Sequence, residues 1–363
     1  MDFSRTLIIK PSSLGDIVQA LPVLTSLREA HPKAHIAWLV ATVFADLLEG
    51  HPRLDRVVTF DRRRYGSIGK SFGATADFVA FVEGLRRKKF TAVIDLQGLF
   101  RSGFLTAATG APSRVGFAAA RELAPMFYTL AVPMPRKEMH AVDRYMALAR
   151  HIGLMDPQAT DHLPIAPEAR ETVRQRLRAE GLAPDDAMVV VSPHARWPTK
   201  QWPPERFAEV VRRLHEQSGT RAVLIGSSAA AAIAREIAAA AASARPVDLV
   251  NRTTLREMVA LVSEARAMVT NDSGPMHVAA TIGTPVVAIF GPTSAERTGP
   301  YGPGHRVLTA GAPCRPCFRR KCLYSNGPEA LACLTGVAAE EVARHLLEIL
   351  RSPRRTADNR EQP

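Results

Sequence analysis

A short run of small and polar residues, 270–277 (TNDSGPMH), has the composition of an anion-binding site. It lies between two apolar runs, which predicts a strand, a polar loop and then a helix. Pro275 suits the first helical turn, where its missing N–H costs nothing. Asp272, Ser273 and Gly274 would leave backbone N–H groups at the start of that helix, where the helix dipole favours a phosphate. The same residues can equally serve as ordinary helix caps.

A second candidate, Asp16, follows the first strand-like run of the chain. Residues 7–9 are apolar, and residues 10–16 (KPSSLGD) separate them from an amphipathic stretch. Asp16 therefore stands where a helix begins and can cap it. The alternative is a carboxylate at the carboxyl edge of a strand, which is where ligands bind in open parallel sheets.

Strand-like and helix-like segments alternate along the chain, which predicts an α/β protein with parallel sheets. A proline-containing stretch with little periodicity, residues 155–167, marks a boundary between two halves of similar size. We predict two Rossmann-like, doubly wound domains, a C-terminal helix and a polar tail that is disordered. Their bounds are 1–160 for the first domain, 168–336 for the second, 337–351 for the helix and 352–363 for the tail.

Two more loops follow predicted strands. Residues 95–102 (DLQGLFRS) carry Arg101, which can reach the same sheet edge as Asp16. Residues 192–203 (SPHARWPTKQWP) form a long, basic and aromatic loop in the second half, and Lys200 in it is either a ligand for an anion or a solvated side chain.

The chain has a net charge of +12, and most of it lies in the first half. Residues 1–155 hold 21 Lys and Arg against 13 Asp and Glu, with dense clusters at 62–64 and 86–89. Such clusters are solvated surfaces or binding sites for anionic partners. No recognition motif for nucleic acid is present, so we expect no nucleic acid partner. We find no apolar run of spanning length and no signal peptide pattern, which disfavours secretion and membrane spanning.

All four cysteines fall in one basic window, with the spacing C-x2-C-x4-C-x10-C. They are Cys314, Cys317, Cys322 and Cys333. A disulfide is unlikely in a cytosolic chain, and the irregular spacing with no histidine at finger distance favours a reduced structural loop over a bound metal.

Four motifs in register resemble the lipopolysaccharide heptosyltransferases of glycosyltransferase family 9. They are residues 12–16 (SSLGD), 199–203 (TKQWP), 271–277 (NDSGPMH) and 290–293 (FGPT). The resemblance implies a GT-B fold, in which two Rossmann-like domains face each other across a cleft. It implies that the N-terminal domain binds the acceptor and the C-terminal domain binds the nucleotide-sugar. It also implies inverting transfer of heptose from ADP-L-glycero-D-manno-heptose to the inner core of lipopolysaccharide, on Kdo-lipid A or a heptosylated core.

The resemblance also assigns roles to residues. Asp16 corresponds to the catalytic base. The donor side comprises Lys200, Asp272, Ser273, Gly274, His277 and Thr293. We expect the acceptor side to comprise Ser13, Gln97, Arg101, Arg62, Arg63 and Arg64. One departure is that Ser227 and Ser228 stand where relatives often hold the ribose with an acidic residue, which leaves the nucleotide preference open.

No Asp-x-Asp pair occurs in the sequence, so we expect neither a metal nor a cofactor at the diphosphate. The expected partners are an ADP-sugar, a lipid A-linked core oligosaccharide and the anionic inner face of the inner membrane, where we predict a cytoplasmic, peripheral monomer. Two alternatives remain open. One is a family member with another sugar or acceptor, and the other is a non-catalytic GT-B protein that binds nucleotides or anionic lipids.

Overall fold

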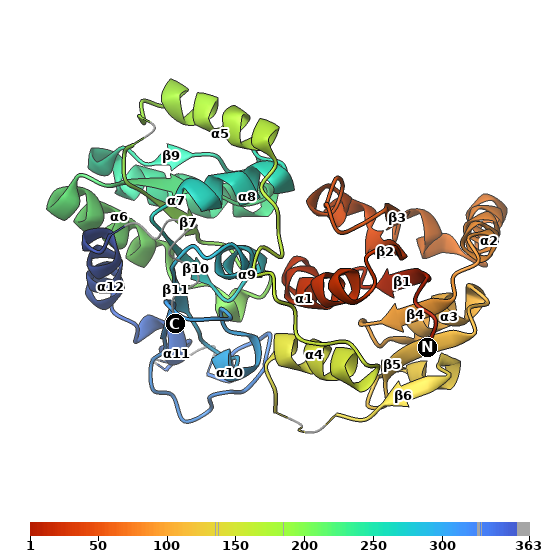
Figure 1. Cartoon of the computed structure of the whole chain (residues 1–363). Coiled ribbons are helices and arrows are strands. Elements are labelled where there is room, and N and C mark those ends of the chain that lie inside the picture. The colour runs from red at the N-terminus through yellow and green to blue at the C-terminus, as the bar shows by residue number, and fades with distance from the viewer. Residues whose placement is uncertain (135, 137, 184, 325–326, 328, 354–363) are drawn as a thin grey trace. The chain divides into compact units, whose positions relative to one another are not determined.

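The chain folds into two compact units, Met1–Pro164 (unit 1) and Ile165–Pro363 (unit 2). The computed structural model in Figure 1 describes all residues except 135, 137, 184, 325, 326, 328 and 354–363. Most of the tail that the sequence predicts to be disordered, from residue 354 on, therefore lies outside the described residues.

Unit 1 is built on a six-stranded parallel sheet in the order β3-β2-β1-β4-β5-β6. The strands are β1 (Arg5–Ile9), β2 (His35–Ala41), β3 (Arg56–Phe60), β4 (Ala92–Asp95), β5 (Ser113–Phe117) and β6 (Leu130–Val132). The chain winds outward from β1 through β2 and β3, and then in the opposite direction from β4. The direction of winding therefore reverses between β1 and β4, which is the usual place for a ligand in such a sheet.

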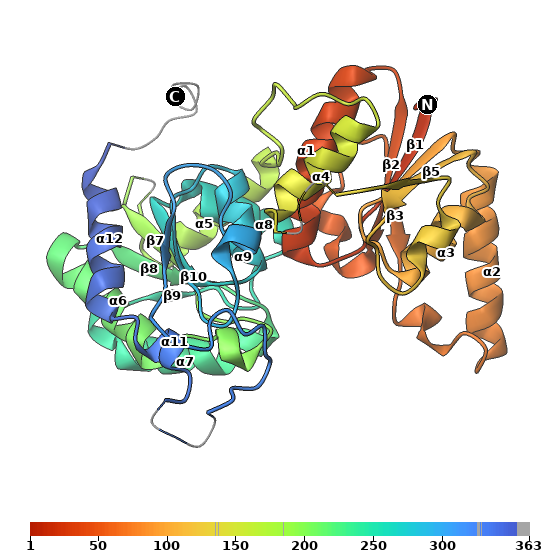
Figure 2. The same ribbon diagram turned by 90° about the horizontal axis from the view of Figure 1, so that it is seen from below.

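Helices cover both faces of the unit 1 sheet (Figure 2). Helices α1 (Leu14–Ala30) and α4 (Ala141–His151) pack against each other, and α2 (Phe72–Arg87) packs against α3 (Phe100–Ala108). Helix α1 is buried over most of its length because its residues are apolar or small on nearly every side. Short 3-10 turns complete the unit, η1 (Thr42–Leu47), η2 (Arg64–Ser67) and η3 (Ala124–Phe127).

Unit 2 repeats this architecture, with a parallel sheet in the order β12-β11-β10-β7-β8-β9. The strands are β7 (Met188–Ser192), β8 (Arg221–Leu224), β9 (Val247–Asp248), β10 (Ala267–Asn271), β11 (Val286–Ile289) and β12 (Arg306–Leu308). Here the winding reverses between β7 and β10.

The helices of unit 2 also divide between the two faces of their sheet. Helix α6 packs against α7 and α12, while α8 packs against α5 and α9. The helices are α5 (Pro167–Ala179), α6 (Pro204–Ser218), α7 (Ala231–Ala240), α8 (Leu255–Glu264), α9 (Gly274–Thr281), α10 (Ala295–Thr298), α11 (Ala332–Thr335) and α12 (Ala339–Arg351). The 3-10 turns are η4 (Pro198–Lys200), η5 (Ser228–Ala230) and η6 (Ala242–Ala244).

Both sheets confirm the predicted α/β class with doubly wound topology. Two local features are not evident from the sequence, namely the 3-10 turn η1 and the short edge strands β6, β9 and β12. Edge strands of two or three residues carry too little periodicity to be recognised in a sequence. In the part of the chain that the structure describes, no helix is both long and apolar enough to cross a bilayer.

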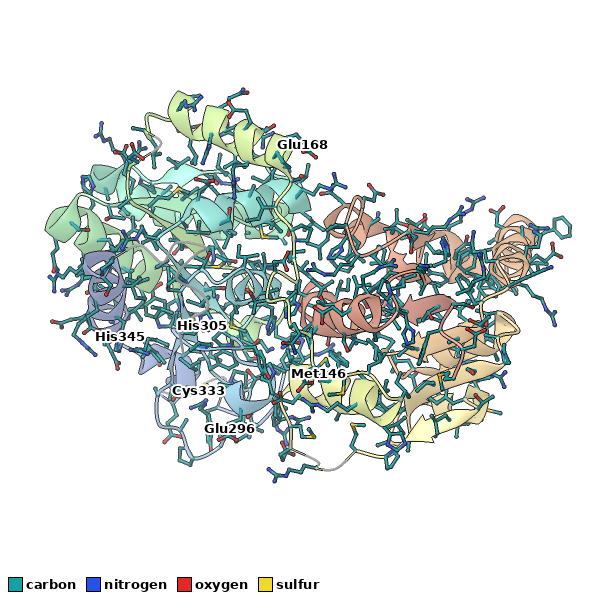
Figure 3. The ribbon with its side chains drawn as sticks, viewed as in Figure 1. Met146, Glu168, Glu296, His305, Cys333 and His345 are labelled. Carbon is teal, nitrogen blue, oxygen red and sulfur yellow. The ribbon has the colours of Figure 1, made fainter. Side chains whose placement is uncertain are left out.

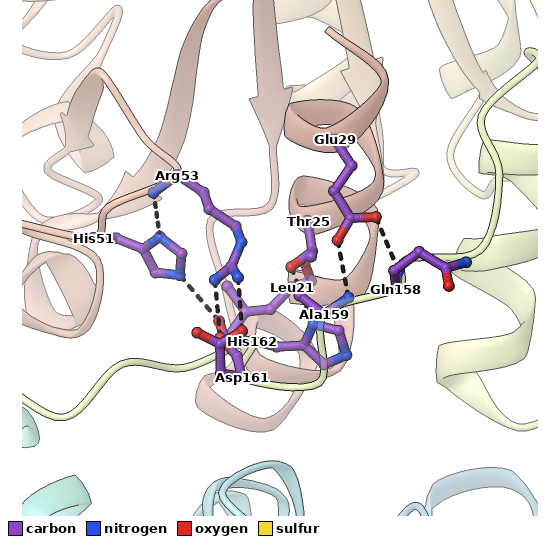
Figure 4. Close-up of polar contacts among 9 residues, drawn as sticks. All are labelled: Leu21, Thr25, Glu29, His51, Arg53, Gln158, Ala159, Asp161 and His162. Carbon is purple, nitrogen blue, oxygen red and sulfur yellow. Dashed lines mark hydrogen bonds and ion pairs between the residues drawn. The ribbon is translucent and has the colours of Figure 1, made fainter. Parts of the chain in front are cut away.

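The last segment of unit 1, residues 155–164, is fastened to α1 and to the loop after η1 by polar contacts (Figure 4). Glu29 accepts hydrogen bonds from the backbone N–H groups of Gln158 and Ala159, each at 2.9 Å. Arg53 pairs with Asp161, with Nη2 2.7 Å from Oδ1. These contacts hold the chain that leads into unit 2.

Two histidines complete this network, and both are held neutral. His51 is 3% exposed, and its Nδ1 accepts from the Arg53 N–H while its Nε2 donates to the His162 carbonyl oxygen. The Nδ1 atom of His162 lies 3.0 Å from Thr25 Oγ1. Burial lowers the pKa of both imidazoles.

This network predicts a loss of stability in mild acid. The unfolded chain takes up protons near pH 6.5, whereas the folded chain resists protonation until lower pH, so the free energy of unfolding falls as the pH drops from about 7.5. The slope is at most about 1.4 kcal/mol per pH unit for each histidine. In urea unfolding at pH 5.5, 6.5 and 7.5, His51→Gln should show a smaller slope than the wild type. Exposed His151, changed to Gln, serves as the control, and equal slopes in all three proteins would contradict the prediction.

Candidate active site

Asp16 lies in the first turn of α1, just beyond the carboxyl end of β1. The N-cap of this helix is Ser13, and Asp16 is the third helical residue, whose carboxylate accepts from the Ser13 backbone in a capping box. The Asp16 atom Oδ2 accepts from the Ser13 N–H at 2.9 Å and from Ser13 Oγ at 2.6 Å. Its other oxygen lies 3.8 Å from the Lys10 Nζ atom, and the Asp16 side chain is 40% exposed. A carboxylate held in this way is fixed in orientation yet reachable from solvent.

The neighbouring strand, β4, ends in a fully buried carboxylate that shapes the next loop. Asp95 accepts from the N–H groups of Gln97 and Gly98 through Oδ1, and from the hydroxyls of Ser102 and Tyr128 through Oδ2. Burial raises the pKa of Asp95, and the four donors oppose that shift. Because all four partners donate, they are suited to an ionised carboxylate. The sequence analysis missed this anchor, although an aspartate at a strand end before a glycine loop is a signal for it.

The predicted acceptor residues lie on the segments that follow β1, β3 and β4 of unit 1. Gln97 follows β4, and its Oε1 atom is buried with no hydrogen-bond partner within the described part of the chain. Arg101 places its guanidinium 5.9 Å from the centre of the Phe60 ring. Arg62, Arg63 and Arg64 follow β3, two strands away from β1 in the sheet.

Two aspartates form hydrogen bonds with the arginine cluster at residues 62–64. Asp61 Oδ1 accepts from the N–H groups of Arg63 and Arg64, and Arg64 Nε lies 2.7 Å from Asp77 Oδ2 on α2. Arg62 and Arg63 are exposed. The cluster is thus not uniform, because Arg64 is already paired with a carboxylate of its own unit.

In unit 2 the winding reversal carries a tight charged pair. The Lys200 Nζ atom lies 2.5 Å from Asp272 Oδ2, and Thr293 Oγ1 donates to the same oxygen at 2.6 Å. Three loops that follow β7, β10 and β11 therefore meet at one carboxylate. Gly291 allows this approach, since a Cβ atom there would lie 3.2 Å from the Thr199 carbonyl oxygen and 2.8 Å from the Leu334 side chain.

The buried residue Asn271, at the end of β10, links the loop that follows β7 to β10 by two hydrogen bonds. Its Oδ1 accepts from the Trp202 N–H at 3.0 Å, and its Nδ2 donates to the Pro193 carbonyl oxygen at 2.6 Å. Ser273 then begins α9 at its N-cap, and Gly274 is the first helical residue. His277 is 7% exposed on the same helix. The predicted donor residues are thus brought together on one edge of the unit 2 sheet.

Trp197 is a further residue of this edge that the sequence analysis did not single out. Lys200 Nζ lies 4.7 Å and Arg320 Cζ 5.1 Å from the centre of the indole ring. Two cations over one ring bring positive charge close to Asp272. The basic, aromatic composition of the 192–203 loop was the feature of the sequence that could have pointed to Trp197.

The cysteine window braces the same loops. The Arg315 Nε atom donates to the Gly291 carbonyl oxygen, the Phe318 N–H to that of Pro292, and the Thr199 hydroxyl to that of Arg319. All four thiols are free, and burial raises the pKa of Cys333, which is labelled in Figure 3. Over the described residues, no three His, Cys, Asp or Glu side chains are placed to hold a metal ion. The window thus contacts the loops that carry Thr199, Gly291 and Pro292.

This fold and these sites define a class, namely an α/β protein of two doubly wound units with a Lys–Asp pair where the winding of each sheet reverses. Comparison with known proteins makes the class specific. Residues 78–327 match the model of glycosyltransferase family 9 (heptosyltransferase). The lipopolysaccharide heptosyltransferase 1 of Pseudomonas aeruginosa is 30% identical over 96% of this chain and 99% of the relative.

Solved structures agree. The Escherichia coli heptosyltransferase WaaC with ADP has a TM-score of 0.74 and 27% identity, covering 95% of this chain and 99% of that one. A family 9 glycosyltransferase from Veillonella parvula has a TM-score of 0.83 and 24% identity, covering 96% and 98%. The chain belongs to glycosyltransferase family 9 and is a glycosyltransferase of GT-B fold.

Proposed function

We propose that this glycosyltransferase moves heptose from ADP-L-glycero-D-manno-heptose to the inner core of lipopolysaccharide. The observation that carries the proposal is the pair of polar edges, one in each unit. Unit 1 presents the carboxylate of Asp16, and unit 2 gathers Lys200, Thr293 and the start of α9 around Asp272. Relatives that cover nearly all of this chain are lipopolysaccharide heptosyltransferases, which supports this choice of sugar and acceptor.

In the proposed reaction the acceptor hydroxyl attacks the anomeric carbon of the heptose. The new bond joins the hydroxyl oxygen to that carbon as the bond from the carbon to the diphosphate oxygen breaks. The hydroxyl proton passes to Asp16, and ADP leaves with the bonding electron pair. Attack from the side opposite the diphosphate inverts the anomeric centre, and a single carboxylate suffices as the general base.

The donor half is proposed for unit 2, which contains the predicted domain 168–336, and the acceptor half for unit 1, which contains the predicted domain 1–160. Lys200 supplies a point charge for the diphosphate, and the N–H groups at the start of α9, at Ser273 and Gly274, supply hydrogen bonds. Asp272 does not touch the diphosphate in this scheme. It orients Lys200 and Thr293, because its Oδ2 atom is shared by both.

We further propose that unit 1 rests on an anionic lipid surface, where a lipid-linked acceptor is found. Exposed apolar side chains occur on the segments that follow β3, β4 and β5, namely Ile68, Phe72, Phe100, Leu123 and Met126. Phe72 is 92% exposed. Large exposed apolar side chains next to arginines are typical of proteins that bind membranes or partners. Arg62 and Arg63 would contribute the attraction to anionic headgroups.

The first test is transfer itself, read by mass spectrometry with ADP-heptose and a panel of truncated lipid A cores. Asp16→Asn should lower turnover at least about a hundredfold, the usual effect of losing a general base, and should leave the affinity for ADP nearly unchanged. An Asn side chain can still accept from Ser13, so a purely structural Asp16 predicts turnover near that of the wild type. No transfer by the wild type from any ADP-sugar would defeat the proposed activity.

The second test addresses the diphosphate. Lys200→Ala should weaken ADP binding about tenfold or more in calorimetry, in line with the loss of a charge-assisted contact. Adenosine binding should change much less, because adenosine carries no phosphate. Arg206→Ala, at a partly exposed position on α6, is the control. Equal affinity of ADP for Lys200→Ala and the wild type would contradict a contact with the diphosphate and leave Lys200 only as the partner of Asp272.

The third test addresses the lipid surface. Arg62→Gln combined with Arg63→Gln should weaken binding to vesicles that contain phosphatidylglycerol by about thirtyfold, since each basic residue contributes about 1 kcal/mol near such a surface. The acceptor KM should rise and ADP affinity should stay constant. The matched control, Arg86→Gln with Arg87→Gln, removes the same charge at the far end of α2. The proposal would be contradicted if vesicle binding did not depend on salt concentration and were equal in the two double variants.

A further inference from the structure

Lys10 is a lysine buried at the centre of the unit 1 edge, with 3% of its surface exposed. It directly follows β1, and its backbone joins neighbouring segments, since its N–H donates to the Leu39 carbonyl oxygen and its own carbonyl accepts from Trp38 Nε1. Its side chain reaches across to β4, where Nζ donates to the Leu96 carbonyl oxygen at 3.1 Å. The ammonium therefore lies between β1 and β4, where the winding of the sheet reverses.

A charge in this position is expensive unless a partner compensates it. Lysine is almost never fully buried without one, because removing the ammonium from water costs several kcal/mol. Here the carboxylate of Asp16 lies 3.8 Å from Nζ, and the ring of Tyr145 on α4 is centred 5.2 Å from it. Burial acts to lower the pKa of Lys10, but Tyr145 and Asp16 outweigh burial, so the pKa lies above its ordinary value and the ammonium stays charged.

We propose that Lys10 is a positioning residue for the transfer reaction, holding the carboxylate of Asp16 ionised and oriented so that it can take the proton of the acceptor hydroxyl. The inference rests on the proposed role of Asp16 as base. Ser13 binds Oδ2 by two short hydrogen bonds, and Lys10 faces Oδ1 at a distance longer than a hydrogen bond. Lys10 thus acts on that oxygen through its charge.

A purely structural account of Lys10 is that it links β1 to β4 through the Leu96 carbonyl oxygen. The two accounts differ in their dependence on pH. The side chains that face the pair from α4 are Tyr145 and Arg144, which both act on Lys10 electrostatically. Neither side-chain type ordinarily changes charge between pH 5 and 8, so an acid limb in the rate profile reports the carboxylate.

The experiment is the pH profile of kcat/KM for Lys10→Met, which keeps the length of the side chain and removes its charge. An opposite charge within about 4–6 Å of a carboxylate shifts its titration by one to three pH units. The acid limb of Lys10→Met should therefore move upward by about one unit or more, and the rate deficit should grow as the pH falls from 8 to 5. Lys33→Met, at an exposed lysine of unit 1, should keep the wild-type profile.

The double variant with Asp16→Asn separates the two accounts further. If Lys10 acts through Asp16, Lys10→Met should cost little additional rate once Asp16 is Asn, so the two effects should be far from additive. ADP affinity and the thermal midpoint show whether each variant is folded. The inference is overturned if the acid limb of Lys10→Met does not move. It is also overturned if the rate loss is equal at every pH and adds fully to that of Asp16→Asn. An active Asp16→Asn protein would instead overturn the role of Asp16.

Discussion

The structure depends on one constraint, which is that a parallel sheet brings the carboxyl ends of all its strands to a single edge. At that edge the backbone leaves the sheet, so polar groups that would be intolerable in the core can be paired there. Both units place a Lys–Asp pair where the winding reverses, between β1 and β4 in unit 1 and between β7 and β10 in unit 2. Helices pack on both faces of each sheet, so most of the strand residues are buried and apolar.

The two edges carry the same pair of residue types with opposite exposure. In unit 1 the lysine is buried and the aspartate is open, with side chains 4% and 40% exposed for Lys10 and Asp16. In unit 2 the aspartate is the more buried partner, at 6% for Asp272 against 17% for Lys200. Each pair therefore offers the more accessible partner to a substrate, a carboxylate in unit 1 and an ammonium in unit 2. Those are the groups that a transferase needs for the hydroxyl and for the diphosphate.

The alternation of apolar runs and small-residue loops was enough to predict the α/β class, because long buried strands are strongly periodic and bounded by clear turn residues. The loops around Asp16, Lys200 and Asp272 could be found for the same reason. What the sequence could not provide was pairing. Nothing local shows that Thr293 and Lys200 share Asp272 Oδ2, that Asp95 collects four donors, or that Lys10 is buried, since each depends on strands brought together by the fold. Nor does the sequence show that Arg64 is paired with Asp77 on α2.

If the diphosphate binds as proposed, the Lys200–Asp272 pair does not have to be broken. An ammonium has three donors and Asp272 Oδ2 uses one of them, so Lys200 can keep this contact and still donate to phosphate oxygens. Thr293 holds the carboxylate in place from the opposite loop, and Asn271 fixes the strand end beneath it. The lysine is then already oriented before the donor arrives, so less conformational freedom is lost on binding. A negatively charged aspartate inside a site for a diphosphate is therefore compatible with binding, provided that it faces the cation and not the phosphate.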